Sequence, residues 1–249
     1  MKISIVQSDI AWAQPASNRA HIDELTAGLD ATDLIVLPEM FSTGFATEPG
    51  GIAESDDDTL RWMLGKARER DCAVAGSVAV KTCDGYANRF YFVKPSGEVT
   101  YYDKHHLFTY GGEQRYYTAG DTKVSVEWRG VTIRLLVCYD LRFPVWSRNT
   151  VSPRYDLALY VASWPATRVA AWDTLLRARA IENQCYVAGV NRVGEDPACR
   201  YCGSSAVIDA YGRVIASCGR DVESTATAVI DLPSLSAFRN KFPVLADAD

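Results

Sequence analysis

Three residues that lie far apart in the sequence have side chains suited to acting together on a carbonyl group: Glu39, Lys104 and Cys138. Cys138 directly follows the apolar run at residues 131–137, which is typical of a buried strand. A thiol at the end of a strand faces a crevice while the sheet fixes its backbone, which is a good position for a nucleophile. The alternative is a core cysteine that packs at a strand end.

Glu39 follows another apolar run, at residues 34–38, and Met40 and Phe41 come next. A carboxylate among such neighbours needs a reason, because burial normally excludes it. Burial favours the neutral form of a carboxyl group, so a buried glutamate is suited to taking a thiol proton and passing it to a leaving amine. A glutamate hydrogen-bonded to a loop backbone is the alternative.

Lys104 lies in the mixed aromatic and basic stretch at residues 101–108, after a strand and a Pro-Ser-Gly turn. Held between a carboxylate and a thiol, its ammonium would lower the pKa of the thiol and stabilise the oxyanion that forms when a carbonyl is attacked. A lysine solvated in a polar loop is the alternative.

Short apolar runs that would position these residues recur along the chain, and several are apolar throughout, which indicates sheets covered on both faces. Apolar residues at helical spacing predict helices at about 17–29, with Ser17 as the possible cap, and at about 60–67 and 167–183. Turn sequences such as Pro95-Ser96-Gly97 indicate antiparallel neighbours, so we expect an α/β fold with mixed sheets. The predicted strands are 2–9, 33–37, 72–80, 88–94, 123–128, 131–137, 156–162, 185–191, 204–210 and 225–232.

The composition narrows the class of protein. The 249 residues are 48% hydrophobic, which is enough for a deep core, and no linker or repeat divides them, so we expect one domain over residues 1–249. A net charge of −5 argues against nucleic-acid binding. The chain has no leader-like segment and no long apolar segment, so we expect a cytoplasmic protein with no membrane association. It has seven cysteines, and because an odd number does not suit a disulfide framework, we expect free thiols.

Several sequence blocks together resemble the nitrilase superfamily of carbon-nitrogen hydrolases, whose Glu-Lys-Cys triad is spread over three blocks. The resemblance covers residues 1–233, nearly the whole chain. The matching blocks are 37–41, 102–107, 136–144, 160–165 and 177–183.

The resemblance implies roles for individual residues. Glu39 matches the general base, Lys104 the oxyanion-stabilising lysine and Cys138 the nucleophile, and Glu113 occupies the place of a second glutamate that orients the lysine or substrate. It also implies a four-layer α-β-β-α sandwich with two mixed β-sheets, which pairs into a homodimer or larger homo-oligomer. Thiol attack on an amide, with a thioester intermediate, requires no metal and no cofactor.

Within the superfamily the chain is most similar to the bacterial omega-amidases, through residues 143–149 and 159–165. That branch releases ammonia from the distal amide of 2-oxoglutaramate or 2-oxosuccinamate. Arg142 is a candidate partner for the far carboxylate of such a small-molecule substrate, with an alternative role in bracing the turn through Asp140 or another acid. Tyr139 offers a backbone amide to the oxyanion, and the candidate pocket walls are Phe45, Tyr110 and Trp164.

Other functions have weaker support. A deaminated-glutathione amidase or an N-carbamoyl amino acid hydrolase would use the same triad, and a catalytically idle interaction protein would have no need of it. Cys199 and Cys202 have a zinc-like spacing, but no second such pair exists. The three histidines lack a helical metal-binding spacing, and the glycines match no phosphate loop or dinucleotide fingerprint.

Overall fold

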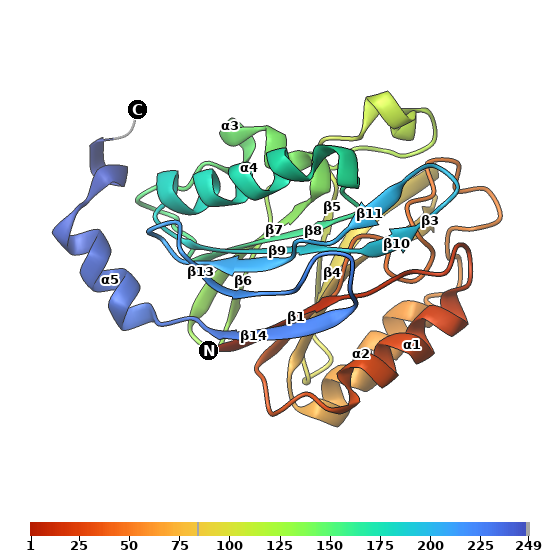
Figure 1. Ribbon diagram of the computed structural model, residues 1–249, viewed down its shortest axis with the longest axis horizontal. Coiled ribbons are helices and arrows are strands. Elements are labelled where there is room, and N and C mark those ends of the chain that lie inside the picture. Colours follow the sequence, from red (N-terminus) through yellow and green to blue (C-terminus); the bar gives the residue numbers. More distant parts are fainter. Residues whose placement is uncertain (84, 248–249) are drawn as a thin grey trace.

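Two large β-sheets lie face to face in the computed structural model, which describes residues 1–83 and 85–247. Helices cover the outer face of each sheet, so the layers run helix, sheet, sheet, helix (Figure 1). Each sheet contains parallel and antiparallel pairs. The predicted fold class, α/β with two mixed sheets, is confirmed.

The first sheet is formed mainly by the N-terminal half of the chain. Its central strands β1, β2 and β3 pair in parallel, and the outer pairs are antiparallel. The strand order is β14 (Ser224–Val229), β1 (Lys2–Gln7), β2 (Leu34–Val36), β3 (Ala73–Thr82), β4 (Gly85–Val93) and β5 (Val99–Asp103).

The second sheet repeats this arrangement in the C-terminal half. Strands β7, β8 and β9 pair in parallel, with antiparallel neighbours on both sides. The order is β13 (Val214–Ser217), β12 (Ala206–Ile208), β9 (Tyr186–Asn191), β8 (Leu157–Ala162), β7 (Val131–Val137) and β6 (Ser125–Trp128), and a separate ribbon pairs β10 (Val193–Glu195) with β11 (Arg200–Cys202).

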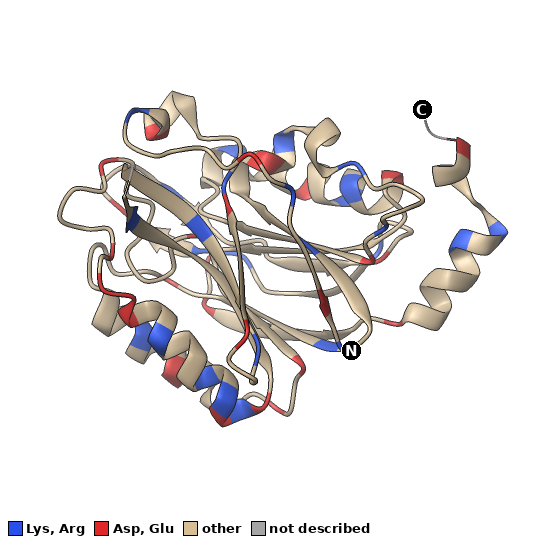
Figure 2. Cartoon of the chain, turned by 180° about the vertical axis from the view of Figure 1, so that it is seen from behind, with Lys and Arg blue, Asp and Glu red and all other residues tan. Residues whose placement is uncertain are grey.

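Helices of both halves face solvent. Helices α1 (Pro15–Ala27) and α2 (Asp58–Arg70) cover the first sheet and carry charged residues of both signs (Figure 2). Helices α3 (Pro144–Ser147) and α4 (Val169–Glu182) lie over the second sheet, and α5 (Leu232–Lys241) extends from one end (Figure 1). A search of the described residues finds no helix with the length and apolar character needed to span a membrane. Five short 3-10 helices complete the described elements: η1 (Thr109–Gly111), η2 (Glu113–Arg115), η3 (Cys138–Arg142), η4 (Ala166–Arg168) and η5 (Val244–Asp247).

Strand alternation divides the core between the layers. In β2, Leu34 and Val36 pack into the large core that the two sheets share, whereas Ile35 packs with Ile22 of α1 and Met63 of α2. β2 therefore buries both faces, as its continuous apolar run predicts.

Helix α4 approaches the second sheet closely over Gly189 of β9. A Cβ atom at this position would lie 2.8 Å from Cζ2 of Trp172, and it would also overlap Leu176. A side chain at position 189 would thus push α4 away from the sheet.

The structure corrects several details of the sequence-based expectations. Helix α1 begins at Pro15, so Ser17 lies within its first turn and is not the cap. Proline suits the first helical position because it has no N–H to leave unpaired. The expected elements did not include β5, β10, β11, β13 or α5.

Candidate active site

The three residues expected to form a triad lie together where strands of both sheets end. Lys104 directly follows β5, and Glu39 lies shortly after β2, so both come from the first sheet. Cys138 directly follows β7 of the second sheet and begins η3. The site is therefore assembled across the contact between the two sheets.

The Lys104 ammonium lies between two carboxylates. Its Nζ donates to Oε1 of Glu39 at 2.9 Å and to Oε2 of Glu113, also at 2.9 Å, and all three side chains are fully buried. Burial opposes the charged form of Lys104, but the two carboxylates outweigh it and raise its pKa above the usual range of a lysine. The ammonium is therefore a fixed positive charge at neutral pH.

Glu39 is held by donors from both sheets. Its Oε1 accepts from Lys104 and, at 2.8 Å, from Asn88 Nδ2, while its Oε2 accepts from the backbone N–H of Ser163 at 2.8 Å. The negative charge of Glu39 also acts on the Cys138 thiol, whose pKa it raises. The carboxylate and the thiol therefore influence each other's ionisation.

Cys138 occupies an unusual turn. Its φ of +42° is a left-handed conformation, which costs a non-glycine residue about 1–2 kcal/mol. Burial and the charge of Glu39 raise the pKa of Cys138 well above that of a free thiol, although Lys104 acts in the opposite direction. Lys104 thus lowers the pKa of this thiol, as expected, but burial and Glu39 outweigh its effect. The raised pKa favours the neutral thiol over the thiolate.

Glu113, in η2, has Lys104 as its main partner and touches no bulk solvent. Its Oε2 also accepts from the backbone N–H of Phe108 at 2.6 Å, which fixes the loop around it. Burial, together with the charge of Glu39, raises its pKa, although Lys104 lowers it. Asn88 Nδ2 lies 3.3 Å from Oε1 of Glu113, so one amide contacts both glutamates.

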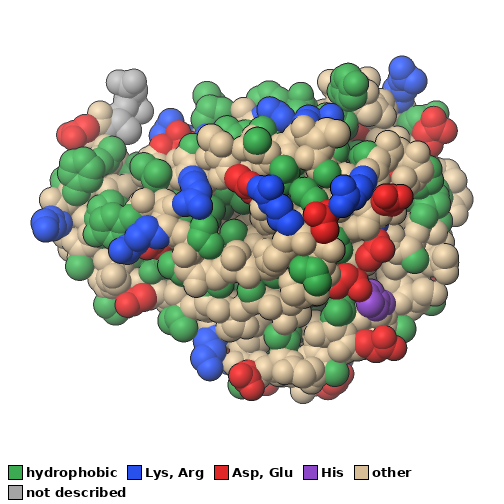
Figure 3. Space-filling model, viewed as in Figure 1, with side chains coloured by type: hydrophobic (Ala, Val, Ile, Leu, Met, Phe, Trp, Pro, Cys, Tyr) green, Lys and Arg blue, Asp and Glu red, His purple; other side chains and the backbone are tan. Residues whose placement is uncertain are grey.

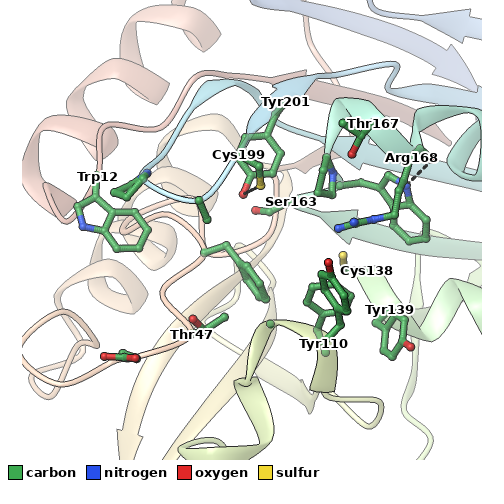
Figure 4. Close-up of a pocket in the computed structure, with 18 of the residues that line it drawn as sticks. Trp12, Thr47, Tyr110, Cys138, Tyr139, Ser163, Thr167, Arg168, Cys199 and Tyr201 are labelled. Carbon is green, nitrogen blue, oxygen red and sulfur yellow. Dashed lines mark hydrogen bonds between the residues drawn. The ribbon is translucent and has the colours of Figure 1, made fainter.

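A cavity of about 740 Å³ opens beside Cys138. Cys138 is 9% exposed and reaches this cavity, whereas the triad's other two side chains lie beneath its wall. In Figure 4 the thiol lies between Tyr110 and Tyr139 on one side and Ser163 on the other. All five residues expected to bind substrate line the cavity, namely Phe45, Tyr110, Tyr139, Arg142 and Trp164. Tyr110 is 86% exposed and thus forms part of the rim.

Arg142 places its guanidinium carbon 4.9 Å from the ring centroid of Trp164. No carboxylate of residues 1–83 or 85–247 forms an ion pair with it. Asp140, the alternative partner weighed from the sequence, accepts instead from Tyr102 Oη at 2.8 Å and from the backbone N–H of Val137 at 2.9 Å. Arg142 is thus available to an anion in the cavity.

Some residues of the site carried no signal in the sequence that identified them. Asn88 stands in β4, and only a polar amide inside an otherwise strand-like run marks it. Ser163 and Arg168 fall within or beside a recognised block, but nothing indicated that the Ser163 N–H binds Glu39 or that Arg168 lines the cavity. Cys199 also lines the cavity, with its Sγ 3.2 Å from Tyr201 Oη.

Within the described residues, no group of three or more His, Cys, Asp or Glu side chains is arranged to hold a metal ion.

Comparisons with known proteins agree with this geometry. The family model described as carbon-nitrogen hydrolase matches residues 2–240. The omega-amidase YafV of Escherichia coli strain K12 is 48% identical over 100% of this chain and 97% of its own length. The 2-oxoglutaramate amidase of Bacillus subtilis strain 168 is 36% identical over 98% of this chain and 96% of its own.

Solved structures extend the comparison. A CN-hydrolase superfamily protein of Xanthomonas campestris, crystallised with an arsenic adduct in its active site, superposes with a TM-score of 0.96 at 44% identity, covering 100% of this chain and 97% of that one. Nit3 of Saccharomyces cerevisiae shares the fold, with a TM-score of 0.88 at 21% identity over 98% of this chain and 94% of its own. With the family match spanning almost all of its length, the chain belongs to the carbon-nitrogen hydrolase family.

Proposed function

We propose that this protein is an omega-amidase. It hydrolyses the distal amide of 2-oxoglutaramate or 2-oxosuccinamate to the 2-oxo dicarboxylate and ammonia. The observation that carries the proposal is the buried Lys104 ammonium, 2.9 Å from both Glu39 and Glu113, in electrostatic contact with the Cys138 thiol that reaches the cavity. The names of the relatives in E. coli and B. subtilis support this choice of substrate.

The first half-reaction forms a thioester on Cys138. As Sγ bonds to the amide carbon, its proton passes to Glu39. The carbonyl oxygen becomes an oxyanion, which the Lys104 ammonium and the backbone N–H of Tyr139 stabilise. The C–N bond then breaks, and Glu39 returns the proton to the nitrogen that leaves as ammonia.

The second half-reaction releases the acid. Glu39 takes a proton from a water molecule as that water attacks the thioester carbon, and the same proton returns to the sulfur as the C–S bond breaks. Glu113 does not touch the reacting atoms in this scheme. It acts as a positioning residue that holds Lys104 in place and keeps it charged.

Substrate choice follows from the cavity wall. Arg142 has no carboxylate partner among the described residues, so its guanidinium is ready to bind the far carboxylate of a dicarboxylate monoamide. Phe45, Tyr110 and Trp164 provide apolar surface for the short acyl chain. An uncharged amide would leave Arg142 without a partner.

Mass spectrometry of enzyme quenched during turnover of 2-oxoglutaramate tests the thioester. We expect an acyl adduct on Cys138, which Cys138→Ala abolishes together with ammonia release. Cys83→Ala, an exposed cysteine outside the cavity, is the matched control. Turnover with no adduct under any quench would overturn the mechanism. Faster ammonia release from N-carbamoyl amino acids or deaminated glutathione would overturn the substrate assignment.

Three broader properties belong to the same proposal. Residues 1–249 form one domain, because both sheets contribute to one site, and limited proteolysis should give no stable half.

The protein works in the cytoplasm, where a reduced Cys138 is maintained, and cell fractionation tests this. Two copies pair into a homodimer through exposed apolar side chains of the C-terminal part of the chain, where Figure 3 shows hydrophobic atoms at the surface. Val214, Ile215 and Phe242 are exposed apolar residues of this part. Light scattering should show a mass of two chains.

A further inference from the structure

A second arginine faces the cavity. Arg168 ends η4, is half-buried and lines the cavity wall (Figure 4). Its guanidinium carbon lies 5.4 Å from the ring centroid of Phe108 and 5.9 Å from that of Tyr110. Its carbonyl oxygen accepts from Trp164 Nε1 at 2.9 Å, so its backbone is tied to the wall. No carboxylate in the described part of the chain forms an ion pair with Arg168.

Arg142 and Arg168 contact the same indole. The guanidinium of Arg142 lies over the ring of Trp164, whereas the backbone carbonyl oxygen of Arg168 accepts from the N–H of that ring. Of the described residues that line the cavity, Glu48 is the sole acid, and it is exposed. The cavity therefore presents two guanidinium groups against one solvated carboxylate. Such a wall favours ligands rich in negative charge and in hydrogen-bond acceptors.

We propose that Arg168 is a specificity-determining residue that, together with Arg142, selects 2-oxo acid amides over α-amino acid amides. The proposal deepens the omega-amidase function and rests on it. A 2-oxo carboxylate presents three acceptor oxygens, and a guanidinium presents only donors.

The competing substrates differ at one carbon. L-Glutamine carries an ammonium where 2-oxoglutaramate carries a keto oxygen. An ammonium has only donors and a positive charge, so beside Arg168 it would meet a like charge and find no acceptor. Glutaramate has hydrogens at that carbon and offers Arg168 no group to bind. Comparing 2-oxoglutaramate with glutaramate therefore measures the attraction between Arg168 and the keto oxygen. Comparing glutamine with glutaramate measures the repulsion between Arg168 and the ammonium.

The experiment compares Arg168→Gln, Arg168→Lys and wild-type enzyme on these three amides, with ammonia release as the readout. Loss of a charged hydrogen-bond donor typically lowers specificity by about 10–100-fold. We expect Arg168→Gln to lower kcat/KM for 2-oxoglutaramate by about that factor, mainly through KM, with a much smaller effect on glutaramate. The preference for 2-oxoglutaramate over glutamine should fall by at least a similar factor, and Arg168→Lys should recover part of it.

Arg154→Gln is the matched control, because Arg154 is exposed and lies outside the cavity wall. Equal losses on 2-oxoglutaramate and glutaramate, or no loss on either, would overturn the role of Arg168. Glutaramate turnover also reports whether the variant is folded. Failure of the omega-amidase proposal is distinguishable, because wild-type enzyme would then release no ammonia from 2-oxoglutaramate.

Discussion

Nδ1 of His106 lies 2.8 Å from Oδ1 of Asp140, and this contact ties the loop after Lys104 to the turn after Cys138. The backbone N–H of His106 donates to the same oxygen at 3.0 Å, and the other oxygen of Asp140 accepts from Tyr102 and Val137. Asp140 is fully buried. It therefore holds the chain segments that carry the ammonium and the sulfur in a fixed relation.

The first prediction concerns this brace. Asp140→Asn replaces one acceptor oxygen with a donor, so it should lower kcat by about 10–100-fold, since small displacements of reacting groups carry penalties of that size. KM should change little, because Asp140 does not line the cavity. The free energy of unfolding should fall by about 1–3 kcal/mol. Steady-state kinetics and urea unfolding measure both effects, and exposed Asp30→Asn is the control. A kcat equal to wild type would refute the bracing role.

The second prediction concerns Glu113. Glu113 and Glu39 together raise the pKa of Lys104, so Glu113→Gln should bring it down. The wild-type ammonium stays charged through the alkaline range. In the variant, kcat/KM should begin to fall at a lower pH, because the neutral lysine cannot stabilise an oxyanion. The loss at neutral pH should be about 100-fold. A pH profile of kcat/KM tests this, with exposed Glu127→Gln as the control. An unshifted alkaline limb would contradict the assignment.

The third prediction concerns the sulfur. Burial and then Glu39 raise the pKa of Cys138, so the thiolate fraction at pH 8 is smaller than that of a free cysteine. Wild-type enzyme should therefore react slowly with iodoacetamide at Cys138, and the rate should increase as the pH rises. Glu39→Gln removes a negative charge and should accelerate alkylation while it abolishes amide turnover. Peptide mass spectrometry follows the site, and slower alkylation in Glu39→Gln would count against a thiol held neutral by Glu39.

The fourth prediction concerns packing under α4. Gly189→Ala places a methyl group against Trp172 and Leu176, and overpacking of this kind costs about 1–3 kcal/mol. Gly65→Ala is an informative control, because Gly65 lies within α2 with no atom near its Cβ position. Alanine there should stabilise the protein by about 1 kcal/mol. Opposite shifts in the urea midpoint are expected, and a Gly189→Ala variant as stable as wild type would contradict the packing argument.

The sequence predicted those parts of the fold that have an unmistakable apolar pattern. β7 was predicted with its exact bounds at residues 131–137, because both of its faces are covered and every second residue is fully buried. β13 and β5 were not predicted, because they are short, and most of their side chains are partly exposed. The helix α5 has little apolar periodicity and begins beside a proline, so its pattern resembled a loop.

The site divides in the same way. Glu39, Lys104 and Cys138 stand in compact sequence blocks, and the resemblance of these blocks to the nitrilase superfamily marked them. Asn88 contacts Glu39 at a sequence separation of 49, and no local spacing encodes such a pairing. Arg168 was missed because its importance depends on the absence of a carboxylate partner among the described residues, and that property exists only in three dimensions.

The backbone N–H of Ser163, which follows a strand of one sheet, donates to an oxygen of Glu39, which follows a strand of the other sheet. Catalytic activity therefore depends on the two sheets remaining packed against each other. Any partly unfolded form in which the layers separate would lose its reaction centre at once, even with every strand still intact. Enzymatic inactivation by denaturant should accordingly coincide with, or precede, the loss of secondary structure, and neither half of the gene expressed alone would retain a trace of turnover.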